Sequence, residues 1–336
     1  MEGDKTVAWF CTYTPLEILD AAGLAAVRRF GDPASLQAAD ALLHPAMCPY
    51  VRACLAEETR KAGAHHAVFV NSCDAMRRLY DAWKAAFPEA FVYLMDLPRN
   101  LGGLAEEILA EEYRLLMEAI REFWGAEIAL ERLRDANLAR EEWRLSYLAQ
   151  ADGASGKERL RMAMQAHAGG ATEAAQDNPS QPGGGRRGQG VPVLLTGNLL
   201  NPEGIVSILD KAGAEVVWID LCNGDRGFSS STLAEGSDLS GFLAALAASY
   251  LQRHPCARMS DSGRRYQLLT QRAREAGARG IIYASLKFCD SYLYDFPRVQ
   301  EMLRREGIPL LRLESDYSDG HVGQVLTRVE AFLEMI

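Results

Sequence analysis

The sequence predicts an α/β protein made of two doubly wound, Rossmann-like parallel-sheet domains with an added helical section. Apolar and β-branched runs of strand length alternate with amphipathic helical stretches, the order that produces parallel sheets covered on both faces. The order strand, turn, helix also begins twice, near residue 6 and again near residue 191. Finally, 336 residues exceed the roughly 250 to 300 at which a single hydrophobic core stops growing.

The first domain is expected over residues 1–151. Its first helix begins at Pro15, a residue favoured at helix starts, and ends at Gly23, a typical helix stop. From about Leu104 to Gln150 the periodicity is helical and highly charged, which predicts the added helical section. The strands are expected in "TVAWF", "AHHAVFVNSC" and "AFVYLMDLP".

The second domain is expected over residues 191–336 and repeats this order. A helix begins at Pro202 and ends at Gly213, and further helix-strand steps follow, each with a glycine before the apolar run. Between the domains, residues 152–190 predict a helical spacer and then a flexible linker rich in Gly, Gln and Pro. The strands are expected in "VPVLLTG", "AEVVWIDLC", "GIIYASLKFC" and "IPLLRLES".

Composition excludes several classes of function. The formal net charge is -9 and the pI is near 5.3, so the chain lacks the basic excess that nucleic-acid binding needs. No run approaches the roughly 18 apolar residues of a membrane helix, and the acidic start "MEGDKTVAWFCTYTP" is unlike a signal peptide. We therefore expect a cytoplasmic protein. No Walker A pattern is present, and no G-x-G-x-x-G follows a predicted strand and opens a helix, so ATP and NAD binding are not indicated.

The placement of the seven cysteines is the main functional signal. Cys73, Cys222 and Cys289 each come at the end of a predicted strand, and Cys11 is close to such an end. In a parallel sheet the carboxyl ends of the strands are where ligands and chemistry gather. A single cysteine there is most simply a buried core thiol. Three or four at strand ends favour a shared site.

The kind of site follows from the donors. The sequence has no C-x-x-C pair and no zinc-finger spacing of Cys and His, which disfavours structural zinc. Thiolates gathered from distant loops of a cytosolic protein also suit iron-sulfur clusters. The aspartates after two of these cysteines, Asp74 and Asp290, are expected to cap the helices that follow.

Eight blocks in order along the chain resemble the benzoyl-CoA reductase and 2-hydroxyacyl-CoA dehydratase family. The similarity covers nearly the whole chain except the linker, and it is more specific than any one block. The blocks are "FCTYTPLEILDAAG", "MCPYVRACL", "VNSCDAMRRLYDAW", "MDLPRN", "IDLCNGDRGF", "HPCARM", "LKFCDSYLYDFP" and "ESDYSDGHVGQVLTRVEAFLEMI".

The resemblance implies a 4Fe-4S cluster in the cleft, held by Cys48, Cys73 and Cys289, with one iron open to a non-protein ligand. It implies an iron-sulfur subunit that removes water from a 2-hydroxyacyl-CoA through a ketyl radical, after one electron is injected. An ATP-dependent iron-sulfur activator would supply that electron. A homodimer, or a heterodimer with a similar subunit, is also implied.

Several alternatives stay open. One cubane leaves three cysteines without a role as ligands: Cys54, Cys222 and Cys256. Either they pack in the core or beside the cluster ligands, or they help to hold a double-cubane cluster. Proteins that resemble this family carry such a cluster and reduce small unsaturated molecules. The chain could also be a non-catalytic electron-relay or structural iron-sulfur subunit, or a metal-free binding module.

Overall fold

The computed structural model describes residues 5–168, 190–260, 262–317 and 322–336, and most of the predicted linker lies outside them. It contains two four-stranded sheets, ordered β2-β1-β3-β4 and β6-β5-β7-β8, in which neighbouring strands are parallel. The predicted α/β class with two Rossmann-like sheets is confirmed. None of the described helices combines the length and hydropathy that crossing a membrane requires.

The elements follow the predicted alternation. The strands are β1 (Thr6–Trp9), β2 (Ala25–Arg28), β3 (His66–Val70), β4 (Val92–Met95), β5 (Val191–Gly197), β6 (Ala214–Asp220), β7 (Gly280–Leu286) and β8 (Leu310–Ser315). The helices are α1 (Leu16–Ala21), α2 (Pro49–Glu58), α3 (Asp74–Ala86), α4 (Ala105–Trp124), α5 (Leu130–Ala151), α6 (Gly156–Ala168), α8 (Ser207–Lys211), α9 (Leu239–Leu251), α10 (Ser262–Glu275), α11 (Asp290–Arg305) and α12 (Val322–Met335). Short turns are η1 (Pro33–Ala39), η2 (Pro202–Val206) and η3 (Asp225–Phe228).

Hydrophobic patterning explains the layers. All residues of β3 and β7 are buried, as expected for strands covered on both faces. In α4 the buried residues recur at helical spacing, from Leu109 through Tyr113 and Leu116 to Ile120, which gives one apolar face. Gly213 and Gly277 follow helices with φ of 83° and 66°, a conformation that glycine adopts without strain.

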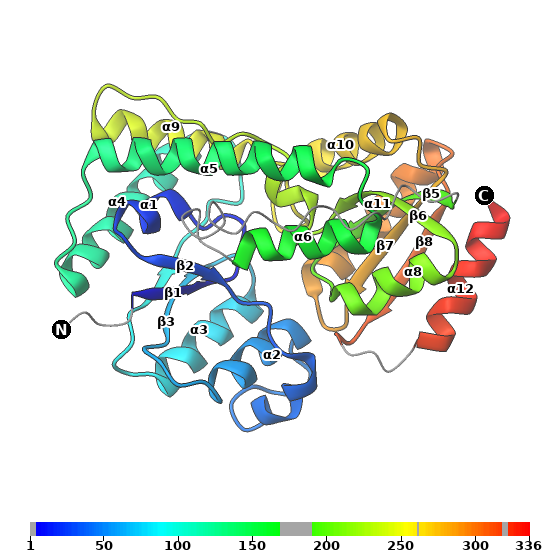
Figure 1. Cartoon of the computed structure of the whole chain (residues 1–336), viewed down its shortest axis with the longest axis horizontal. Helices are drawn as coiled ribbons and strands as arrows, with labels where there is room; N and C mark the ends of the chain where they lie inside the picture. The colour runs from blue at the N-terminus through cyan, green and yellow to red at the C-terminus, as the bar shows by residue number, and fades with distance from the viewer. Residues whose placement is uncertain (1–4, 169–189, 261, 318–321) are drawn as a thin grey trace.

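Of the predicted helical section, α4 lies beside the first sheet, and α5 extends from the first half towards the second. In Figure 1, α5 runs across the top of the molecule with α9 beside it, and α6 lies between the two sheets. Contacts of α6 reach both β2 and β6. The helix predicted in the spacer is therefore confirmed as α6, and it connects the two halves.

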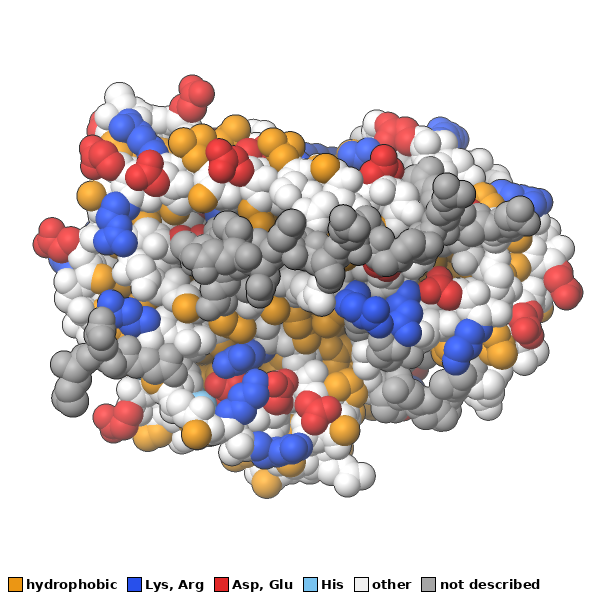
Figure 2. Space-filling model, in the orientation of Figure 1, with side chains coloured by type: hydrophobic (Ala, Val, Ile, Leu, Met, Phe, Trp, Pro, Cys, Tyr) orange, Lys and Arg blue, Asp and Glu red, His pale blue; other side chains and the backbone are white. Residues whose placement is uncertain are grey.

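The two halves share apolar packing. Buried Phe10 and Phe69 of the first half belong to the same hydrophobic cluster as Leu194 and Tyr283 of the second. Helix α9, which follows the second sheet's β6 in sequence, packs against α4 and contributes to the core around the first sheet. The face in Figure 2 shows hydrophobic side chains in the hollow between the two lobes. The domain limits 1–151, 152–190 and 191–336 stay a prediction.

Candidate metal centre

Three of the cysteines occupy equivalent places in the fold. Cys48, Cys73 and Cys289 are the N-cap residues of α2, α3 and α11. The backbone N–H groups at a helix N-terminus favour negative charge, so this position stabilises a thiolate. Strands β3 and β7 end at Val70 and Leu286, earlier than predicted, because the chain turns before each cysteine to begin a helix.

The prediction for the two aspartates is wrong in one respect. Asp74 and Asp290 are the first residues of α3 and α11, and neither helix has a side-chain N-cap hydrogen bond. The cap position belongs to the preceding cysteine in both cases. The carboxylates still lie in the first turn, where the helix dipole favours negative charge.

The N-cap cysteines form a first thiol group. Burial, with the neighbouring Cys289 and Cys73 thiols, raises the pKa of Cys48 to about 12. Burial also raises the pKa of Cys289, although Arg258 and a hydrogen bond with Asn198 act against it. Each of these thiols acts electrostatically on another, so the structure brings together the three cysteines that the sequence singled out.

The backbone before Cys289 is strained. Phe288 has a φ of 58°, in the left-handed region that bulky residues rarely adopt, and its side chain is 50% exposed. Such a conformation costs about 1–3 kcal/mol and persists only when its surroundings enforce it. It follows β7 directly and sets the turn that places Cys289 at the start of α11.

A second thiol group comprises Cys11, Cys222 and Cys256. Cys11 follows the end of β1, Cys222 follows the end of β6, and Cys256 lies in the loop after α9. Burial first, and then the Cys256 and Cys222 thiols, raise the pKa of Cys11 to about 12. Cys11 therefore joins this group, although the sequence placed it only close to a strand end.

Arg258 lies between the two thiol groups. Its Nη2 is 3.9 Å from the Sγ of Cys289. Burial alone would lower the pKa of Arg258. Four neighbouring thiols nevertheless hold this pKa above its usual range: those of Cys73, Cys289, Cys256 and Cys222. The Arg258 guanidinium thus interacts electrostatically with both thiol groups, and its Nε has no hydrogen-bond partner among the described residues.

Further cations surround Cys222. Arg226 Nη1 is 3.5 Å from its Sγ, and Arg28 Nη1 donates to its backbone oxygen at 2.8 Å. Burial alone would raise the pKa of Cys222, yet Arg226, Arg258 and Arg28 hold it below the ordinary thiol value. The surroundings therefore favour the thiolate of Cys222, whereas they disfavour the thiolates of Cys11, Cys48, Cys54 and Cys289.

The two thiol groups meet at a pocket of about 510 Å³, counting its open mouth. Cys11, Cys48, Cys222 and Cys256 line it together with Asn198 and Arg258, whereas Cys73 and Cys289 of the first group do not. Cys54 does not line it. That residue lies within α2, its Sγ 3.9 Å from the backbone oxygen of Arg29, and burial raises its pKa.

The donors at the site are soft thiols, the kind of ligand that iron-sulfur clusters use. No three His, Cys, Asp or Glu side chains within the described ranges form a group that could hold one metal ion. A single tetrahedral ion needs thiolate sulfurs about 3.8 Å apart, from metal–sulfur bonds of about 2.3 Å. A cubane binds each thiolate through a different iron, so its thiolates lie farther apart. Buried thiols near helix N-termini and arginines match that chemistry.

The pKa pattern gives a prediction for metal-free protein. Iodoacetamide at pH 8 is expected to modify Cys222 at least about tenfold faster than Cys11, because each pH unit below a thiol pKa cuts the reactive thiolate about tenfold. Both cysteines are partly buried, so access is similar. Mass spectrometry of timed digests measures the rates. Equal alkylation rates for Cys222 and Cys11 would contradict this prediction. So would an Arg226→Gln variant in which Cys222 is alkylated as fast as in the wild type.

Fold and site together define a class: a parallel α/β protein with cysteines from both sheets converging on one pocket. The family model for 2-hydroxyglutaryl-CoA dehydratase, D-component, matches residues 11–336, and the chain belongs to this family. The resemblance noted in the sequence is thereby confirmed.

Curated relatives match almost end to end. A putative dehydratase subunit YjiM of Escherichia coli (strain K12) is 27% identical, covering 99% of this chain and 92% of its own length. The lactoyl-CoA dehydratase subunit beta of Anaerotignum propionicum is 25% identical with the same coverage. The (R)-phenyllactyl-CoA dehydratase beta subunit of Clostridium sporogenes is 23% identical, again over 99% and 92%.

Proposed function

We propose that this chain is a cytoplasmic iron-sulfur enzyme subunit with two clusters, one on each thiol group, that reduces small unsaturated molecules. The observation that carries it is the grouping of six cysteines as Cys48, Cys73 and Cys289 beside Cys11, Cys222 and Cys256. The proposal keeps the three ligands expected from the sequence. It replaces Cys54 with Cys11 in the second set.

The chain's own residues prepare the site for negative charge. Bound clusters would supply single electrons at low potential. Arg258 acts on four of the thiols, and Arg226 and Arg28 add positive charge near Cys222. Asn198, 3% exposed, hydrogen-bonds with Cys289, and its Oδ1 has no other partner within the described ranges. Burial of Cys48 and Cys256 keeps water away and strengthens each of these interactions.

A second candidate function is radical removal of water from a 2-hydroxyacyl-CoA. It is favoured by the relatives named as beta subunits of lactoyl-CoA and phenyllactyl-CoA dehydratases. In that case the first thiol group would hold one 4Fe-4S cluster, and Cys11, Cys222 and Cys256 would be packing thiols. The chain would then work with a homologous subunit, either as catalyst or as electron relay.

Both candidates need an external source of reducing power. The chain has no Walker A motif and no G-x-G-x-x-G at a strand-to-helix turn. We therefore propose an ATP-dependent iron-sulfur activator as partner, together with a second similar subunit.

Iron and sulfide analysis of anaerobically purified protein tests the proposal. Two clusters give about eight irons per chain and one gives about four. Turnover assays with activator and ATP then compare a small unsaturated substrate with a 2-hydroxyacyl-CoA. About four irons with acyl-CoA turnover would support the second candidate. Colourless protein would overturn both, and a cluster spectrum indifferent to every substrate would indicate a relay.

A further inference from the structure

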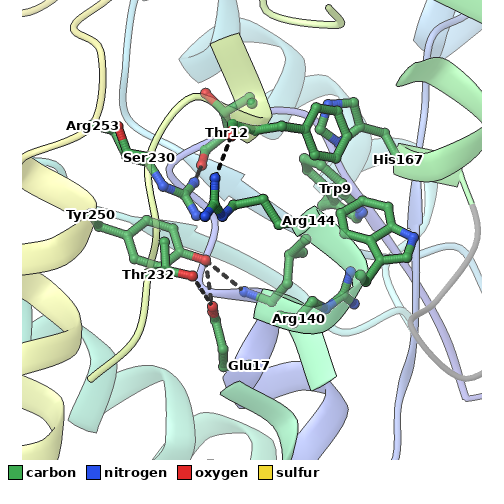
Figure 3. A pocket seen from close by; sticks show the side chains of 14 residues that line it. Trp9, Thr12, Glu17, Arg140, Arg144, His167, Ser230, Thr232, Tyr250 and Arg253 are labelled. Atoms are coloured by element: carbon green, nitrogen blue, oxygen red, sulfur yellow. Dashed lines mark hydrogen bonds between the residues drawn. The ribbon is translucent and has the colours of Figure 1, made fainter. Parts of the chain in front are cut away.

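A second cavity lies under the helical section, and its environment differs from that of the thiol pocket (Figure 3). It has about 460 Å³, counting its open mouth. Its walls come from both halves of the chain: Trp9 of β1, Trp143 of α5, His167 of α6, Phe228 of η3 and Tyr250 of α9. No sulfur atom lines it, so the chemistry argued above leaves it unused.

Two deeply buried side chains in this cavity have unpartnered polar atoms. His167 is 5% exposed and stacks on Phe228, with ring centroids 4.6 Å apart. Neither of its ring nitrogens has a hydrogen-bond partner in the described residues, and the same holds for Nε1 of Trp9, which is 2% exposed. Buried polar atoms are normally paired, so three exceptions in one cavity indicate a missing partner.

The arginines of the cavity are unequally neutralised. Arg140 makes two hydrogen bonds to the carboxylate of Asp20, and Arg144 makes two to Glu141. No carboxylate of the described residues pairs with Arg253. Its Nη1 donates to the backbone oxygen of Thr12, its guanidinium lies 3.7 Å from the Tyr250 ring centroid, and its Nε has no partner.

The one acidic wall residue is already engaged. Glu17 accepts hydrogen bonds from Tyr250 at 2.7 Å and from Thr232 at 3.1 Å, and Figure 3 shows these three together on one side of the cavity. Burial, reinforced by Arg28, Arg253 and Arg140, lowers the pKa of His167 well below its ordinary value. The imidazole is therefore neutral and offers one donor and one acceptor.

The unsatisfied groups define the ligand. Trp9 Nε1, Arg253 Nε and one nitrogen of His167 are donors, and Arg253, which has no carboxylate at salt-bridge distance among the described residues, favours an anionic ligand. A carboxylate has two oxygens that accept several hydrogen bonds. Rings on several walls favour a flat, unsaturated body. The geometry points to a binding site for a small planar carboxylate in this cavity.

A phosphate fits the same donors less well. Three phosphate oxygens need more donors, and the forks of Arg140 and Arg144 are already filled by Asp20 and Glu141. Thr12 lines both this cavity and the thiol pocket, and it follows Cys11 directly. A ligand here would lie beside the second thiol group, but its binding does not depend on the proposed function.

Calorimetric titration of the full-length protein, as purified anaerobically, tests the site with three matched probes. 2-Furoate, planar and anionic, is expected to bind saturably. Tetrahydro-2-furoate, which keeps the charge but is not flat, and 2-furamide, which is flat but neutral, are each expected to bind at least about tenfold more weakly. Inorganic phosphate should compete poorly. Absence of saturable furoate binding would mean that the unpartnered atoms face only water and would overturn the site.

Variants test the donors. His167→Phe keeps the stacking but removes the ring nitrogens, so furoate affinity is expected to fall about tenfold, the effect of one hydrogen bond to a charged group. Without ligand its melting temperature should not fall, because an unpartnered polar group has been removed. Trp9→Phe should weaken binding similarly. His44→Phe, an exposed histidine outside the cavity, is the control. Unchanged furoate affinity in both cavity variants would overturn the assignment.

Discussion

Replacing Cys222 by alanine is expected to halve the iron of the anaerobically assembled protein, from about eight to about four per chain. The second thiol group loses one of its three thiols, while Cys48, Cys73 and Cys289 keep theirs. Colorimetric iron and sulfide assays measure the content. Electron paramagnetic resonance of the reduced protein should show one cluster signal in place of two interacting ones.

Cys54→Ala is the control, because Cys54 is a cysteine outside the pocket, buried within α2 against Arg29. It is expected to retain all of its iron. Cys289→Ala should also halve the iron, leaving the other cluster. Full iron content in Cys222→Ala, or loss of iron in Cys54→Ala, would remove the basis for the second cluster.

Asp220→Asn is expected to lower the free energy of unfolding by about 3–5 kcal/mol at pH 7, the usual cost of breaking a buried ion pair. Asp220 is fully buried and is 2.7 Å from Arg226 Nε and 3.2 Å from Arg265 Nη1. Its Oδ2 also accepts a hydrogen bond from Thr196. Removing the charge leaves two buried arginines with less compensation. Urea unfolding of metal-free protein measures the difference.

The pH dependence gives an independent check. Burial alone would raise the pKa of Asp220, but Arg226, His254 and Arg265 hold it well below its usual range. The stabilisation is therefore complete above the unfolded value of about 3.9 and is lost as the pH falls below it. The wild type should lose stability steeply there, and Asp220→Asn less steeply.

Glu301→Gln is the control for this variant. Glu301 also pairs with two arginines, Arg304 and Arg305, but on an exposed helix face. Solvent screens exposed ion pairs, which contribute little to stability, so the change should be small. Equal losses in both variants would show that the buried network around Asp220 has no special weight.

Sequence reasoning predicted the fold because the periodic signals were local. Apolar runs such as "GIIYASL" and "HAVFV" became β7 and β3, and the charged helical stretch became α4 and α5. It could not predict that α9 would pack on α4, because that contact depends on how distant helices meet. Strand ends were also misplaced, since an N-cap cysteine looks like the last apolar residue of a strand.

The membership of the two thiol groups was harder to predict from the sequence than the fold. Cys54 is one of the thiols that the sequence leaves over after one cubane, but the structure places it within α2, with its Sγ 3.9 Å from the backbone oxygen of Arg29 and outside the pocket lining. Cys11 was given less weight, although the first apolar strand ends just before it. The order β2-β1-β3-β4, which places β1 beside β3, cannot be read from one sequence.

Helix α9 has a consequence for how the chain holds together. Its residues Phe242, Leu246 and Tyr250 lie in the apolar core around the first sheet, although they come after β6. If the chain were cut between its two halves, the first half would lose the apolar side chains with which α9 packs on its core. We therefore expect the lobes to melt in one cooperative transition, with little freedom to swing about a hinge.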